Sequence, residues 1–132
     1  MGAWTPILSI DVTYRGATIS WRSPDSAMSR YDALMTRHGA EIARRRGQRT
    51  ADMTDEERIE FAREVEDALR LQMPDDLGQI MCDMFVEGVF AWEGVCGPGG
   101  GRLDCNVGTR RAIPYEDKLA VAALYLERTR EV

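Results

Sequence analysis

At 132 residues, with 44% hydrophobic and 30% charged side chains, the chain is long enough for one folded domain with a hydrophobic core, spanning residues 1–132. Its net charge of −5 argues against a general affinity for the phosphates of nucleic acids. No apolar run approaches the roughly 18 residues that a membrane-spanning helix needs, so neither nucleic acid nor a membrane is an expected partner.

The first 22 residues are predicted to form a β-hairpin. Residues 7–14 alternate between apolar and polar side chains, and the apolar ones are Leu8, Ile10, Val12 and Tyr14. Arg15-Gly16 can turn the chain, and residues 17–22 then alternate again. An isolated hairpin is only marginally stable, so we expect its apolar face to pack against helices.

Residues 23–92 are predicted to be the helical middle of the domain. Ser23-Pro24-Asp25 is typical of a helix start with Ser23 as the N-cap, and this helix either stops at Gly39 or continues to Arg46. Residues 54–57 fit the capping box of a second helix. The second helix is expected to direct five side chains toward the core, namely Ile59, Ala62, Val65, Ala68 and Leu69.

A third helix is expected after Pro74, which ends the second one. Its apolar residues recur at i, i+3, i+4, i+7 and i+8, as in an amphipathic helix, and they are Leu77, Ile80, Met81, Met84 and Phe85. The pattern does not decide whether this helix ends at Gly88 or continues to Trp92.

Residues 93–111 are predicted to be a glycine-rich loop, and residues 112–132 a C-terminal helix. Five consecutive residues from Gly97 to Gly101 contain four glycines and one proline, which is typical of a turn or loop. Together the elements predict an α+β fold that is mostly α, with an N-terminal β-hairpin packed on a bundle of about four helices.

No motif predicts catalysis, so we expect the protein not to be an enzyme and to hold no metal or other cofactor. His38 is the one histidine of the chain, and we interpret it as a surface side chain near a helix end. The cysteines Cys82, Cys96 and Cys105 contain no Cys-x-x-Cys pair, which argues against structural zinc. Cys96 and Cys105 flank the glycine-rich turn, where a disulfide is conceivable, although a cytoplasmic address favours two reduced thiols.

The methionines allow two interpretations. Flexible thioethers suit surfaces that accept several helical partners, whereas a methionine stripe at helical spacing is more often part of the core. If the stripe is exposed, a partner-binding groove should draw on Met81, Met84 and Phe85, with Trp92 nearby. Exposure of these side chains separates the two interpretations.

The order of the elements resembles a family of phage proteins. The chain combines an extended segment with Tyr14-Arg15-Gly16, a helical middle, a Trp-x-Gly-Val element at 92–95, and a glycine-bearing loop before a final helix at 114–130. This plan is similar to that of the tail assembly chaperones and small tail-module proteins of long-tailed bacteriophages. The resemblance implies a non-enzymatic protein that binds the tape measure protein and tail subunits during tail morphogenesis, in the cytoplasm of the bacterial host.

Two other functions stay open. A small phage-encoded inhibitor of a host protein would fit the acidic helices, and salt-sensitive binding to a basic target would identify it. A head–tail connector or completion protein would be found in purified virions, where a chaperone should be missing. The first residues lack the basic start and apolar stretch of a secretory signal, which agrees with a cytoplasmic address. The sequence does not predict the oligomeric state.

Overall fold

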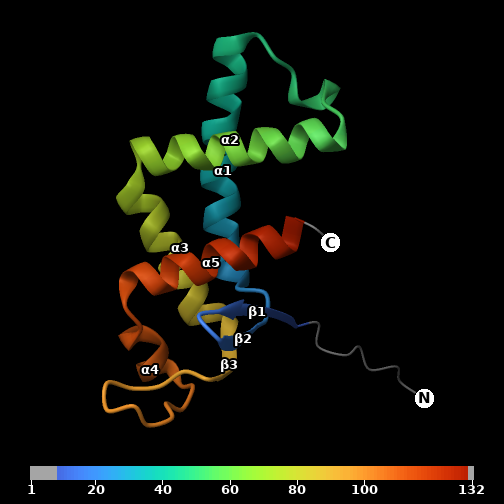
Figure 1. The fold of residues 1–132 in the computed structure, drawn as a ribbon. Helices are drawn as coiled ribbons and strands as arrows, with labels where there is room; N and C mark the ends of the chain where they lie inside the picture. The colour runs from blue at the N-terminus through green and yellow to red at the C-terminus, as the bar shows by residue number, and fades with distance from the viewer. Residues whose placement is uncertain (1–8, 131–132) are drawn as a thin grey trace, which may run out of the picture.

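The computed structural model describes residues 9–130, and it confirms the expected α+β fold with mostly helical structure (Figure 1). Three strands, Ile10–Tyr14 (β1), Ala17–Trp21 (β2) and Val89–Glu93 (β3), form one sheet. The helices are Asp25–Arg46 (α1), Asp55–Gln72 (α2), Pro74–Gly88 (α3), Val107–Ala112 (α4) and Tyr115–Arg130 (α5), and Thr50–Asp52 forms a 3-10 turn (η1). No helix of the described part combines the length and the hydropathy that would let it cross a membrane.

The N-terminal hairpin forms as the alternation of its residues predicts. β1 and β2 pair antiparallel, with Val12 opposite Ile19, and both of these side chains are buried. The connecting turn has positive φ at Arg15 (49°) and Gly16 (80°), as in a type I′ turn, whose twist matches that of the flanking strands. Leu8, the first apolar residue of the predicted alternation, lies outside the described residues.

A third strand, which the sequence analysis did not predict, completes the sheet. β3 pairs antiparallel with β2, so the strand order is β1-β2-β3. The expectation that the helical middle extends to residue 92 is therefore wrong for residues 89–92. Among these residues Val89 is β-branched, and Phe90 and Trp92 are aromatic; both types favour a pleated, half-buried surface. The predicted loop, residues 93–111, also differs, because Glu93 ends β3 and residues 107–111 belong to the short helix α4. The C-terminal helix α5 begins at Tyr115, three residues later than predicted.

The long helices mostly follow the local signals of the sequence. α1 continues through Gly39 to Arg46, the longer of the two predicted extents. The capping box of α2 forms, with two reciprocal hydrogen bonds of 3.2 Å each between Thr54 and Glu57. α3 begins at Pro74 itself, one residue earlier than expected, because proline is well suited to the first position of a helix.

The N-terminus of α1 is capped by a distant side chain. The Glu87 carboxylate of α3 accepts hydrogen bonds from the backbone N–H groups of Ser26 at 2.7 Å and Ala27 at 3.2 Å. The prediction that Ser23 is the N-cap is wrong, since the Ser23 hydroxyl donates to the Asp25 carboxylate instead, at 2.7 Å. A carboxylate suits this place because the N-terminus of a helix carries unpaired N–H groups and partial positive charge.

The core lies between the sheet and helices α1, α2, α3 and α5, and Figure 1 shows the sheet beside α5, at one end of the helices. Trp21 of β2 is 0% exposed and stacks on Tyr125 of α5, with ring centroids 4.3 Å apart. The ring of Phe85 on α3 meets the same indole edge-on at 5.9 Å. Ile59 was expected in the core but is 38% exposed, whereas Phe61 of α2 packs against the core and lies with Val65 beside Gly39 of α1.

Candidate functional site

The residues that the sequence predicts for partner binding lie in two different surroundings: three are in the core, and Trp92 lies nearer the surface. Met81, Met84 and Phe85 are 3%, 0% and 1% exposed, so they are core residues and present almost no surface to a partner. The neighbouring helices α1, α2 and α5 all pack against α3 and occupy its apolar face. The prediction of an exposed groove built on this stripe is therefore wrong, and the interpretation of the stripe as part of the core is confirmed. Trp92 is half-buried, and its indole N–H donates to the carbonyl of Leu103 at 2.7 Å.

Phe85 and Trp92 come together in the wall of a cleft at the turn end of the hairpin. The cleft has a volume of about 590 Å³ and lies between the hairpin, the glycine-rich loop, and the junction of α4 with α5. We refer to it as the loop cleft. Its apolar lining residues are Ala17, Ile19, Phe85, Trp92, Val95, Leu103, Ala112, Ile113 and Val121. Apolar hollows of this size are typical of sites that bind a ligand or a partner's side chains.

The glycine-rich loop is an ordered part of this cleft. The Leu103 N–H donates to the Val95 carbonyl at 3.0 Å, and Cys96 and Arg102 form an isolated β-bridge just beyond this pair. Together with the hydrogen bond from the Trp92 indole, these contacts fold the loop into a short hairpin. The loop therefore places Val95 and Leu103 side by side in the cleft wall.

Tyr14 and Arg15 of the hairpin meet Asp117 of α5 at the loop cleft, although the two segments are far apart in sequence. The Tyr14 hydroxyl donates to Oδ1 of Asp117 at 2.7 Å, which ties β1 to α5 across 103 residues. This hydrogen bond, together with burial, raises the pKa of the Tyr14 phenol. Arg15, on the turn of the hairpin, has Nη1 at 3.7 Å from the same Asp117 oxygen, and its side chain is 77% exposed. The sequence analysis did not identify Asp117, because no local pattern links it to the hairpin.

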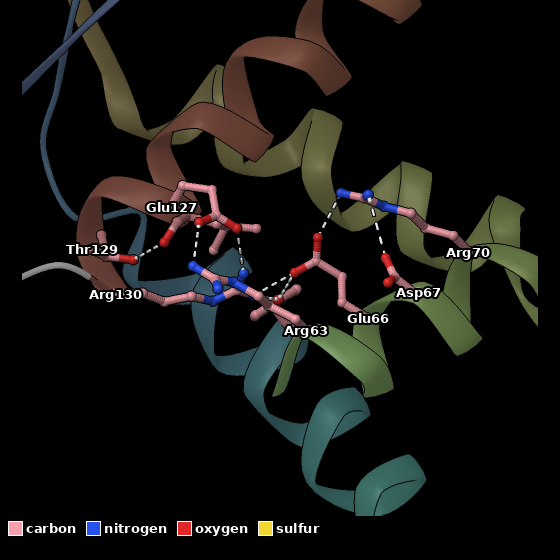
Figure 2. A network of polar contacts seen from close by, with 9 residues as sticks. Arg63, Glu66, Asp67, Arg70, Glu127, Thr129 and Arg130 are labelled. Carbon is pink, nitrogen blue, oxygen red and sulfur yellow. Dashed lines mark hydrogen bonds and ion pairs between the residues drawn. The ribbon is translucent and has the colours of Figure 1, made fainter. Parts of the chain in front are cut away.

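A second polar cluster joins α1, α2 and α5 away from the loop cleft (Figure 2). Glu66 of α2 is 5% exposed, and its carboxylate accepts hydrogen bonds from the Tyr31 hydroxyl at 2.6 Å, from Arg70 at 2.5 Å and from Arg130. Arg130 also donates to Glu127 at 2.9 Å. Sequence reasoning missed this cluster, because an acidic residue on a charged helix gives no sign of burial.

The pKa shifts in this cluster follow from burial and hydrogen bonding. Burial disfavours the ionised form of Glu66, but hydrogen bonds from Tyr31 and Arg130, and the charges of Arg130 and Arg70, outweigh it, so the pKa of Glu66 lies below its usual value. Burial and the hydrogen bond to Glu66 raise the pKa of the Tyr31 phenol. Each charge in the cluster is paired, which indicates a structural role in holding the three helices together.

The cysteines and His38 lie on different segments of residues 9–130 and differ in burial. All three cysteines are free thiols: Cys82 is buried, which raises the pKa of its thiol, Cys96 is exposed and Cys105 is half-buried. His38 lies well inside α1, because the helix continues past it to Arg46, and its side chain is half-buried. The expectation of a surface position near a helix end is wrong. In the same residues no three His, Cys, Asp or Glu side chains gather as metal ligands.

Comparison with known proteins returns no match among protein-family models, curated proteins or solved structures. The resemblance to phage tail proteins therefore depends on the sequence motifs alone.

Proposed function

We propose that the protein is a non-enzymatic tail assembly chaperone of a long-tailed bacteriophage, and that it binds its protein partner at the loop cleft. The observation that carries this proposal is a convergence. The segments that resemble the phage family are far apart in sequence, yet residues from several of them line the same cleft. These residues are Tyr14 and Arg15 of the hairpin, Trp92, Gly94 and Val95 of the Trp-x-Gly-Val element, Gly97 and Pro98 of the glycine-rich loop, and Pro114 before the final helix. A pattern that gathers at one apolar hollow supports a binding role for the motif residues.

The proposed partner is the tape measure protein, with tail subunits bound during tail morphogenesis in the host cytoplasm. Long amphipathic helices expose apolar side chains until they are assembled, and the loop cleft offers such a side chain an apolar wall that includes Val95, Leu103 and Ile113. Burying one large apolar side chain contributes about 1.5–3 kcal/mol. Stable capture therefore requires further contacts around the cleft, in the manner of a helix held in a groove.

A pull-down with a matched pair of variants tests this function. Tagged protein is recovered from infected or prophage-induced cells, and its partners are identified by mass spectrometry. Leu103→Glu places a charge in the loop cleft, whereas Leu71→Glu places the same charge on α2, where Leu71 is 85% exposed and does not line the cleft. We expect the native protein and Leu71→Glu to recover the tape measure protein and tail subunits, and Leu103→Glu to lose them.

The outcomes separate the competing functions. Circular dichroism of both variants first establishes that the fold is retained. Recovery of the same partners by a folded Leu103→Glu variant would exclude the loop cleft as the binding site. Recovery of a single basic host protein, in a salt-sensitive manner, would favour a host-protein inhibitor. Presence of the protein in purified virions would favour a connector or completion protein.

A further inference from the structure

Arg15 stands at a backbone position that does not favour arginine. With φ at 49°, it is the one non-glycine residue of residues 9–130 that has positive φ. The first position of a type I′ turn favours asparagine, aspartate or glycine, because a side chain with a Cβ is strained there unless it is short and polar. Residues held in such conformations gather at binding and catalytic sites. The turn itself gives no reason for an arginine at this place.

The guanidinium of Arg15 lies at the loop cleft over the ring of Tyr14, with its central carbon 5.3 Å from the ring centroid, and within residues 9–130 most of its N–H groups stay free to bind. Its side chain is 77% exposed, and its ion pair with Asp117 is long, at 3.7 Å. The Tyr14 hydroxyl donates a hydrogen bond to the same Asp117 oxygen over the shorter distance of 2.7 Å. A guanidinium carries five N–H donors, so most of the hydrogen-bonding capacity of Arg15 is directed to no protein group in the described residues. Arg15 and Asp117 are the two charged side chains among the lining residues of the cleft.

We propose that Arg15 is the polar anchor of the loop cleft, and that it binds a carboxylate of the partner segment whose apolar side chain enters the cleft. This inference rests on the proposed function and specifies the partner's chemistry: an amphipathic helix with glutamate or aspartate next to a large apolar residue. Arginine suits this task because its planar fork binds a carboxylate through two parallel hydrogen bonds. Asp117 and Tyr14 then act as positioning residues for the turn and its guanidinium.

Binding of two synthetic peptides to the full chain tests the proposal. Both are amphipathic helices with the same leucine stripe; in one the stripe is flanked by glutamate, and in the other by glutamine. Fluorescence anisotropy of the labelled peptides gives each Kd. We expect the glutamate peptide to bind the native protein roughly tenfold more tightly than the glutamine peptide, since a charge-assisted hydrogen bond replaces a neutral one. Arg15→Asn should abolish this preference, and Arg15→Lys should retain part of it.

Stability measurements keep the test decisive. Asparagine is favoured at the first position of this turn, so Arg15→Asn should unfold at the same temperature as the native protein or higher. Equal affinity of the native protein for the two peptides, or no binding of either, would overturn the proposal. Tighter binding of the glutamate peptide by Arg15→Asn would overturn it too, because Arg15 would then not be the group that binds the carboxylate. The proposed function is tested separately, by which partners the native protein recovers in the pull-down and by whether Leu103→Glu loses them.

Discussion

Replacing Glu66 with glutamine should remove a substantial part of the stability of the fold. The carboxylate is 5% exposed and accepts hydrogen bonds from Tyr31, Arg70 and Arg130. Breaking a buried ion pair by removing one partner costs about 3–5 kcal/mol. Glutamine keeps the shape of the Glu66 side chain and one acceptor oxygen. Arg70 is 47% exposed, so solvent screens its attraction to the carboxylate. We therefore expect a loss of about 2–3 kcal/mol in the free energy of unfolding, or about 10 °C in Tm.

Urea titration and thermal melts at pH 7, followed by circular dichroism, measure this loss. Glu64→Gln is the matched control, because Glu64 forms an ion pair with Arg46 in which both side chains are nearly half exposed, at 45% and 47%. Its midpoint should stay close to that of the native protein, since water replaces an exposed ion pair readily. A Glu66→Gln variant as stable as the native protein would refute the reasoning about buried charge.

The pH dependence of this loss follows from the lowered pKa of Glu66. A carboxyl group whose pKa is lower in the folded state than in the unfolded chain stabilises the fold above its unfolded pKa, about 4.3 for glutamate. That stabilisation is lost as the pH falls through the folded pKa. The stability difference between the native protein and Glu66→Gln should therefore be nearly constant from pH 7 to about pH 5 and shrink below it. A difference that persists unchanged in acid would contradict the pKa shift.

Other substitutions test the packing around α3. A Cβ at Gly88 would lie 2.7 Å from the ring of the buried Trp21, so Gly88→Ala should cost about 2–3 kcal/mol in urea titrations. Gly78→Ala is the control, because a Cβ there would meet the hydroxyl of Tyr115, a residue that is 51% exposed and can rotate away. This change should be neutral or should stabilise the fold by up to about 1 kcal/mol. Equal losses of stability in the two variants would contradict the packing around Gly88. Glu87→Ala removes the cap of α1 and should cost about 1 kcal/mol in thermal melts, and an unchanged midpoint would refute the cap.

Features that depend on neighbouring residues could be predicted from the sequence. The hairpin follows from the alternation of β1 and β2, because the two-residue period places all apolar side chains on one face. The capping box of α2 joins Thr54 to Glu57, three residues away, so its partners are visible in a short window. The end of α2 before Pro74 and the start of α3 there follow from the geometry of proline itself.

Features whose partners are distant in sequence could not be predicted in this way. The cap of α1 comes from a carboxylate 61 residues away from Ser26, and Tyr31 meets the buried Glu66 across 35 residues. The strand character of residues 89–93 depends on the free edge of β2, since a short apolar run can form either a helix or a strand until a partner is present.

The candidate site divides along the same line. The sequence by itself determined that Met81, Met84 and Phe85 share one apolar face of a helix, because helical periodicity is a local property. Only the tertiary structure decided that this face is core, since α1, α2 and α5 cover it. The loop cleft likewise exists only in the folded chain, where hydrogen bonding brings Tyr14 to Asp117 across 103 residues. Burial and long-range pairing are properties of the packed assembly of elements, and no single segment carries them.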